Sequence, residues 1–570
     1  MQQASKLTLA AAIGMSLSSL AGAGTPPYFN PLTQSSAVAP PNHINELTGP
    51  FVSPAGITQI NVTSMTEIEA DVEQSTIRVP FGNISSMWDM IAFDPSGRYL
   101  FIPHETPFGA GVSRLDLTTN KSEILLAGNM AGAGAFEDGA TPNWDYDYGA
   151  FDPARWTPNG TVWLGEEWSG TGRVIEMLDP TGSAPADPTA RDELEGSHFR
   201  VIENIANVAH EGISFSKKWR NQVIYYVDEW RSGAIYALVL NTPGDYTGGG
   251  QTFVLSVDEF LPSGGDPAAL WNEGSNPEAQ RFGMATWVPI TDAQGNPNPG
   301  MPNPFRDGPT EDPREVPETR GGRAAADAVG ATVFGRPEDS IVGLLPNFNE
   351  VLYVATTSEK AVISIEMLGN GKAMVRQFAS EANTPKNAGF PSTTGTLDSP
   401  DNLEMDALGN IFIIEDSPNS GAVGGDIWFA RDVDSDGVAE SLDHFMSNQV
   451  AGSESSGMEF VPSDPSRFFM VVMHPTSTDL GAVPEGIGDA VWEFNISGAV
   501  PPPCDSQNAF VACDDAAGGS GLLGFSKQLE RVTSKAADDK RVQRVQPTTR
   551  DDQFLVPRPG NGRRAMLLNR

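Results

Sequence analysis

Acidic and histidine side chains recur beside short apolar strands in this chain. The stretch Thr157–Trp168 shows the unit clearly, because a tight turn leads into an apolar strand that ends at Glu166 and Glu167. We count six such units, which start roughly 60 residues apart except for one gap of about twice that length. The flanking groups include His104, Glu105, His210, Glu211, Glu338, Asp401, Glu459 and His474.

Hairpin geometry predicts where these groups meet. Two strands joined by a tight turn run antiparallel, so a cluster before the first strand lies beside a cluster after the second. Hairpins arranged radially would bring all clusters to one face around the axis. Carboxylates crowded there repel one another unless protons or cations neutralise them, and Ca²⁺ is bound by several oxygen ligands. We therefore expect several calcium ions, with Glu105, Asp401 and Glu459 among the ligands. The alternative is that these are ordinary solubilising residues at strand ends.

The repeat predicts an all-β fold, a six-bladed β-propeller over residues 81–500. A Gly, Pro, Asn and Asp-rich interval at about 241–330 interrupts the repeat as an insertion, and such insertions often cover a site. Within it, Arg281–Pro289 has the composition of a strand. Residues 24–80 are rich in Pro, Ser and Thr, so we expect an irregular N-terminal extension.

The chain ends differ from the body in composition. Residues 1–23 combine Lys6, an apolar run and a small-residue end at Ala23, which predicts a secretory signal peptide and a secreted or periplasmic protein. No later segment approaches the roughly 18 continuous apolar residues of a membrane span. In an oxidising compartment Cys504 and Cys513 would close a small disulfide loop. Residues 501–570 continue into a basic tail that we expect to be disordered or loosely docked.

The whole chain is strongly acidic, with a formal net charge of −37 and a pI near 4.4. This charge argues against nucleic acid or an anionic membrane as a partner. A phosphate ester would also be repelled unless bound cations and an arginine reversed the local field. Solubility in a saline habitat is the alternative reason for the charge.

A second calcium motif stands apart from the repeat. Oxygen-bearing residues occupy loop positions 1, 3, 5, 9 and 12, and Gly437 occupies position 6, as in EF-hand calcium loops. The flanking Ile427–Ala430 has the pattern of a strand, so we expect a structural calcium-binding turn. An acidic hairpin without an ion is the alternative. The five residues are Asp432, Asp434, Asp436, Glu440 and Asp443.

Several of these motifs also resemble a known family. In order they are Thr157–Glu167, His210–Gly212, Arg336–Asp339, Pro400–Asn402 and His474–Pro475. Together they resemble the PhoX-type alkaline phosphatases over most of residues 85–495. Members of that family are secreted or periplasmic six-bladed propellers that hydrolyse phosphomonoesters with calcium and a di-iron centre. The resemblance implies the same fold and reaction here.

The resemblance also implies roles for individual residues. Glu211 and Glu338 would be metal ligands, Glu166 and Glu167 would hold calcium, and Arg336 would be catalytic by binding the phosphate oxygens. His210 and His474 would join Arg336 in contacting the substrate. The family's iron-bridging Cys falls on Gly165 in an ungapped match, and the family's usual twin-Arg export signal is absent from residues 1–23. An all-oxygen site favours Ca²⁺ or Mg²⁺ over iron.

Three functions therefore stay open. The first is a calcium-dependent phosphatase acting as a monomer on a small phosphate ester. The second is another hydrolase such as a lactonase or esterase, in which calcium polarises a carbonyl and His104, His210 or His474 acts as base. The third is a non-catalytic binding module stabilised by calcium, since a fold does not fix a function.

Overall fold

The computed structural model describes residues 27–39, 45–72, 86–136, 143–168, 172–260, 281–305, 321–416, 424–476 and 485–499. The expected signal peptide, Cys504, Cys513 and the basic tail lie outside these residues. The described elements are mostly strands, with the short helices α1 (Asn45–Thr48), α2 (Met65–Asp71), α3 (Arg191–Leu194) and α4 (Gly321–Ala328). No helix within this described part has the length and apolar composition to cross a membrane. Because strands make up most of these elements, the described part of the chain has an all-β fold.

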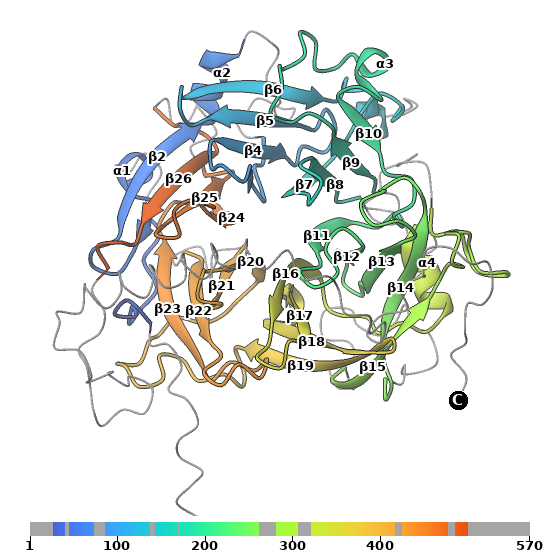
Figure 1. Cartoon of the computed structure of the whole chain (residues 1–570). Helices are drawn as coiled ribbons and strands as arrows, with labels where there is room; N and C mark the ends of the chain where they lie inside the picture. Colours follow the sequence, from blue (N-terminus) through green and yellow to red (C-terminus); the bar gives the residue numbers. More distant parts are fainter. Residues whose placement is uncertain are drawn as a thin grey trace, which may run out of the picture.

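The strands form sheets arranged like the blades of a propeller around a central axis (Figure 1). Two sheets each have four strands that are consecutive in the chain. One contains β3 (Ala92–Phe93), β4 (Tyr99–His104), β5 (Gly111–Asp116) and β6 (Lys121–Ala127). The other contains β7 (Phe151–Trp156), β8 (Val162–Glu166), β9 (Val174–Met177) and β10 (Phe199–Val201).

Two further sheets take one strand each from the N-terminal part of the chain. In the first, β20 (Pro400–Met405), β21 (Ile411–Glu415), β22 (Asp426–Arg431) and β23 (Ser441–Asn448) are joined by β1 (Phe51–Val52). In the second, β24 (Glu454–Phe460), β25 (Arg467–Met473) and β26 (Ala490–Asn495) are joined by β2 (Thr58–Ser64). Because β2 pairs with the last described strand, the two ends of the strand series share one sheet and close the ring.

The expectation of an irregular stretch at 24–80 is wrong for the helices α1 and α2 and for the strands at residues 51–52 and 58–64. The reason is that the outer edges of β23 and β26 have free backbone groups, and a short alternating strand such as β2 can pair with them.

The remaining strands form one nine-stranded sheet. Its order is β11 (His210–Phe215), β12 (Val223–Asp228), β13 (Ile235–Leu240), β14 (Gly250–Val257), β15 (Gly283–Pro289), β19 (Lys372–Ser380), β18 (Ala361–Gly369), β17 (Glu350–Thr356) and β16 (Pro337–Leu344). Strand β15 pairs with β14 on one side and with β19 on the other. The interval 241–330 is therefore not one insertion between blades, as was expected. Strand β14 pairs with β13, and β15 bridges two groups of strands. The strand expected at Arg281–Pro289 is confirmed as β15.

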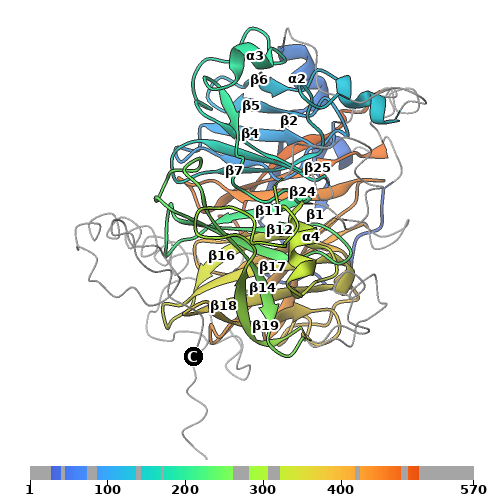
Figure 2. The ribbon, with the colours of Figure 1, turned by 90° about the vertical axis from the view of Figure 1, so that its right-hand side faces the viewer.

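Apolar packing holds these sheets together. Every residue of β12 and of β13 is buried, as expected for strands covered on both faces. Ala325 and Ala326 of α4 pack with Leu238 and Val254 in one hydrophobic cluster. Figure 2, the ribbon turned by 90°, shows α4 at the outside of the body near β14.

The innermost strands contact one another around the axis. Their contacts run in the closed order β3, β7, β11, β16, β20, β24 and back to β3. The start of each innermost strand therefore faces the same central region, which is where the acidic clusters were expected to meet.

Candidate metal centre

The innermost strands interrupt their pairing at their acidic residues. The register shifts between Phe151 and Ala154, His210 and Ile213, Pro337 and Ser340, and Pro400 and Leu403. The extra residues at these β-bulges begin with Asp152, Glu211, Glu338 and Asp401. A bulge re-aims side chains away from the alternation of a regular strand. The bulges thus explain how several strands direct carboxylates at one centre.

Eight carboxylates gather there in four groups of three. Within each group, ligand oxygens lie within 4.8 Å of one another. Asp89, Asp152, Glu211 and Asp401 each belong to two groups, so the four groups form a closed chain. We call this set the carboxylate ring: Asp89, Glu105, Asp152, Glu167, Glu211, Glu338, Asp401 and Glu454. Five of its members were predicted from the sequence, namely Glu105, Glu167, Glu211, Glu338 and Asp401.

Burial and mutual repulsion make this ring unfavourable without counter-charges. Burial, followed by the charge of Glu454, raises the pKa of Glu105 to about 8. Burial also raises the pKa of Asp152 and of Glu211 well above its ordinary value, and neighbouring carboxylates raise it further. Buried like charges of this kind require protons or cations.

The donor set fits hard divalent cations. All the ring ligands are carboxylate oxygens, which are the ligands that Ca²⁺ and Mg²⁺ prefer. Asp152 is buried, and its Oδ1 has no hydrogen-bond partner among the described residues. A buried carboxylate oxygen without a donor is costly, and a cation would satisfy it. The ring could therefore hold several hard cations that share carboxylates.

We expect cation-free protein to lose stability as the pH rises. A carboxyl group whose pKa is higher in the folded state stabilises the fold most below its unfolded pKa, and this contribution is lost as the pH rises through the folded value. For Glu105 that window runs from 4.5 to about 8. The melting temperature of chelator-treated protein should fall across this window. Saturating calcium should remove the fall, because cations then replace the protons. Thermal melts in a pH series test this, and an equal fall with calcium would contradict it.

Arg336 lies at the edge of the ring. Its Nε donates to Oε1 of Glu229 and lies 3.2 Å from Oε1 of Glu338. The charges of Glu338 and Glu229 raise the pKa of Arg336, so the guanidinium stays charged. Its side chain keeps 33% exposure, and its backbone has a φ of 52°, in the left-handed region that non-glycine residues rarely adopt. A partly open cation beside clustered carboxylates can contact an anionic ligand.

His474 also reaches the ring, through Glu454. Its Nε2 lies 2.7 Å from Oε2 of Glu454, and its Nδ1 lies 3.0 Å from the carbonyl oxygen of Gly452. Burial lowers the pKa of His474, but the hydrogen bond and charge of Glu454 outweigh it and raise the pKa to about 10. This histidine is therefore a cation beside the ring rather than a base.

His210 and His104, which were also expected as possible bases, are both buried. His210 is fully buried, its ring centroid lies 5.5 Å from that of Tyr226, and burial lowers its pKa to about 3. This environment differs from the one expected for a substrate contact. His104 is held between Ser86 and Ser113, whose hydroxyls lie 2.8 and 2.7 Å from its ring nitrogens. Its position is that of a structural residue.

Three carboxylates expected to bind metal belong neither to the ring nor to the group of Asp432, Asp434, Asp436 and Glu440 in the second calcium motif. Both oxygens of Glu166 accept hydrogen bonds of 2.7 Å from the Arg173 guanidinium. Glu459 follows the bulge in β24. Burial raises its pKa to about 7, although the charge of Arg155 lowers it. The carboxylate of Asp443 is bound by Arg431, with Nε 2.5 Å from Oδ2. In Glu166 and Asp443 the nearby guanidinium occupies the oxygens that a cation would need.

The second calcium motif does bring its other acids together. Ligand oxygens of Asp432, Asp434, Asp436 and Glu440 lie within 4.8 Å of one another. Asp432 also accepts the backbone N–H groups of Asp436 and Gly437, at 3.0 and 2.8 Å. Gly437 has a φ of 87°, a conformation that glycine adopts without strain.

Asp89, Asp152, Glu229 and Glu454 were not predicted as ligands from the sequence, although the first three belong to the repeated clusters at the strand ends. A signal existed for Asp89 and Asp152, because each follows an aromatic residue at the same place in the repeat where Glu211 follows His210. Glu454 carries no such signal. In its strand the bulge begins with Gly457, and Glu454 reaches the ring from three residues earlier.

Gly165 lies where packing leaves no room for a side chain. A Cβ at this position would lie 2.7 Å from Cβ of His210 and 3.0 Å from Cγ of Pro153. Real Cβ atoms do not approach other atoms so closely, so a side chain there would require a backbone shift. Gly165 is therefore a packing residue between β8 and β11 in this fold.

We compared the chain with models of known protein families and with known proteins. A family model described as alkaline phosphatase PhoX matches residues 197–476. No curated protein matches the sequence. The structure of Pseudomonas fluorescens PhoX in complex with vanadate, a transition state analogue, superposes with a TM-score of 0.51 at 14% identity, covering 83% of this chain and 99% of that one.

Two other solved structures superpose less well. One is XC5397 from Xanthomonas campestris, a gluconolactonase, with a TM-score of 0.33, 11% identity and coverage of 81% of this chain and 99% of its own. The other is the PQQ-bound aldose sugar dehydrogenase of Streptomyces coelicolor, with a TM-score of 0.34, 12% identity and coverage of 78% and 99%. At these identities the likeness concerns the fold alone.

Proposed function

Because the chain belongs to the PhoX-type alkaline phosphatase family, we propose that it hydrolyses phosphate monoesters at the carboxylate ring, with Arg336 contacting the phosphate. The observation that carries this proposal is the closed chain of four carboxylate groups with a partly exposed arginine at its edge. Clustered acids alone repel a phosphate. Acids that hold cations beside an arginine attract one.

The chain's own residues would divide the work. The ring carboxylates hold divalent cations, for which we propose Ca²⁺, since the ring has no thiolate and its ligands are all oxygen. When bound, such cations neutralise charge on the phosphoryl oxygens and lower the pKa of water. Phosphoryl transfer needs chiefly positioning and charge neutralisation. Arg336 supplies a planar donor for two phosphate oxygens, while Glu229 holds that guanidinium in place.

The ring of innermost strands supports the count of six blades. Four are the separate sheets, and we infer that β11–β14 and β16–β19 are two further blades bridged by β15. We also propose export to the periplasm or the exterior, on the composition of residues 1–23, and action as a monomer.

Elemental analysis combined with a chelation assay tests the function. Purified mature protein should contain calcium and no iron. Chelation should abolish hydrolysis of a phosphomonoester, and calcium should restore it. Calcium without turnover would support a binding role instead. Iron in stoichiometric amount would overturn the all-oxygen site.

A further inference from the structure

Three buried carboxylates occupy one equivalent register position, opposite the residue before a bulge. In register, Glu166 pairs with Phe151, Asp228 with His210, and Glu415 with Pro400. Each partner is the residue that directly precedes a bulge carboxylate. All three acids have 0% exposure, although isolated buried carboxylates are costly. We call them the anchor carboxylates.

Each anchor carboxylate accepts a backbone hydrogen bond from the segment that leads into its bulge. Oε1 of Glu166 accepts the N–H of Gly149 at 3.2 Å. Oδ1 of Asp228 accepts the N–H of Ala209 at 3.1 Å. Oε1 of Glu415 accepts the N–H of Asp398 at 2.9 Å. These donors stand two or three residues before Asp152, Glu211 and Asp401 respectively.

Each anchor is also followed in the chain by an acid that faces the site. Glu167 follows Glu166 and belongs to the ring. Glu229 follows Asp228 and binds Arg336. Asp416 follows Glu415, and its N–H donates to the carbonyl oxygen of Ser399 at 3.0 Å, two residues before Asp401. Its charge adds to those of Glu338 and Glu229 in raising the pKa of Arg336. An anchor thus ties together the two chain segments that supply one part of the centre.

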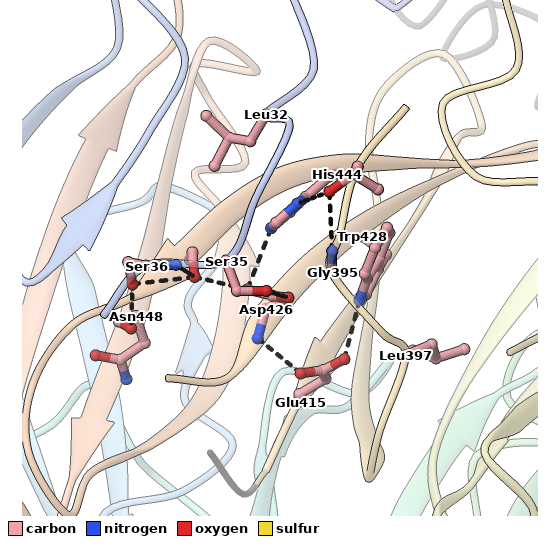
Figure 3. A network of polar contacts seen from close by, with 12 residues as sticks. Leu32, Ser35, Ser36, Gly395, Leu397, Glu415, Asp426, Trp428, His444 and Asn448 are labelled. Carbon is pink, nitrogen blue, oxygen red and sulfur yellow. Dashed lines mark hydrogen bonds and ion pairs between the residues drawn. The ribbon is translucent and has the colours of Figure 1, made fainter. Parts of the chain in front are cut away.

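Further contacts fix the anchors themselves. Arg173 and Arg323 each bind their anchor, Glu166 and Asp228, through two guanidinium nitrogens. Glu415 instead accepts N–H of Asp426 at 2.7 Å and indole Nε1 of Trp428 at 2.9 Å (Figure 3). Oxygens engaged in this way are occupied as hydrogen-bond acceptors.

We propose that Glu166, Asp228 and Glu415 are positioning residues that hold the metal-binding bulges in place. Two other units use uncharged groups at the same register position. His104 pairs with Trp88 and contacts Ser86, three residues before Asp89, while Thr356 pairs with Pro337. Hydrogen-bond partners of this kind orient the residues that bind the metal. Their substitution typically weakens metal affinity by about 10- to 100-fold. The inference rests on the proposed metal-binding role of the ring.

Glu415→Gln gives the sharpest test. The N–H groups of Asp398, Asp426 and Trp428 donate to the Glu415 carboxylate, so an amide at this position places its own donor against one of them. Calcium titration of cation-free protein should show about 10- to 100-fold weaker binding. Phosphatase activity should return when calcium is raised by the same factor. Asp228→Asn, which also removes the carboxylate charge that Arg323 binds, provides a second variant.

Glu350→Gln is the matched control. Glu350 is equally buried and accepts hydrogen bonds from Ser216, Tyr225 and the N–H of Lys218, at 2.7 to 2.9 Å. It stands at the start of β17, the opposite end of that strand from Thr356. The Glu350→Gln substitution should lower the melting temperature of cation-free protein and leave its calcium affinity unchanged.

The outcomes separate the inference from the proposed function. If Glu415→Gln and Asp228→Asn lower only the melting temperature, as Glu350→Gln does, the anchors are merely structural and the inference is wrong. If the unsubstituted protein binds no divalent cation, the proposed function fails first.

Discussion

Arg336→Met is expected to lower kcat/KM for a phosphomonoester by about 100- to 1,000-fold, the usual cost of removing a preorganised group that stabilises transition-state charge. Arg336 keeps 33% exposure beside the ring, and its Nε is held by Glu229 and lies 3.2 Å from Glu338. The substitution keeps the apolar stem but removes the planar pair of donors. Calcium content should not fall, because Arg336 is not among the ring ligands.

An arginine of similar exposure provides the control. Arg467 keeps 34% exposure and pairs with Glu493 at 2.7 Å on β25 and β26. Arg467→Met should leave kcat/KM near that of the unsubstituted protein. Steady-state kinetics on a phosphomonoester and on a neutral ester complete the test. A decrease in kcat/KM of less than about tenfold would show that Arg336 does not bind the phosphate. Hydrolysis of the neutral ester that survives the substitution would favour a lactonase or esterase.

The site could be predicted where it follows from hairpin topology. Antiparallel pairing alone places the residues before one strand beside the residues after the next. Glu105 and Glu167 follow their second strands, while Glu211, Glu338 and Asp401 stand at the start of their first strands. All five lie in the ring. The N-terminal edge strands β1 and β2 were missed because their pairing depends on edges formed by strands roughly 400 residues later.

Side-chain direction at the strand ends could not be predicted in the same way. Glu166 and Glu167 are adjacent and chemically alike, but only Glu167 faces the ring. Glu166 belongs to none of the four groups, and Arg173 binds its carboxylate instead. Arg173 stands directly before the next strand, β9, so nothing in the sequence next to the two acids distinguishes them.

The β-bulges are a second feature that could not be predicted from the sequence. A bulge shifts the alternation by one residue and so changes which side chains face the axis. In β24 the shift lies between Ser456 and Glu459 and starts with Gly457. Glu454 before the shift therefore reaches the ring, and Glu459 after it does not. Sequence reasoning chose Glu459 because it could not see the shift.

Glu211→Gln is expected to have opposite effects on stability with and without calcium. Glu211 belongs to two of the four carboxylate groups, so its loss should weaken two cation sites. In cation-free protein the same change removes a buried like charge, since burial and the charges of Asp152 and Asp401 raise the pKa of Glu211. The cation-free variant should therefore melt at a higher temperature than cation-free unsubstituted protein, and calcium should stabilise it less.

The accompanying loss of activity should be large. Cations at these sites carry much of the charge neutralisation, so kcat/KM should fall about 1,000-fold, which corresponds to about 4 kcal/mol of transition-state stabilisation. Glu350→Gln, the same substitution at a buried carboxylate outside the ring, should not raise the cation-free melting temperature. Melting curves with chelator and with calcium distinguish these cases. A cation-free Glu211→Gln protein that melts lower than the unsubstituted protein would mean that the ring is held by hydrogen bonds. A higher melting temperature together with lost calcium binding is the signature of carboxylates kept close for the sake of cations, because only such residues destabilise the empty fold and stabilise the loaded one.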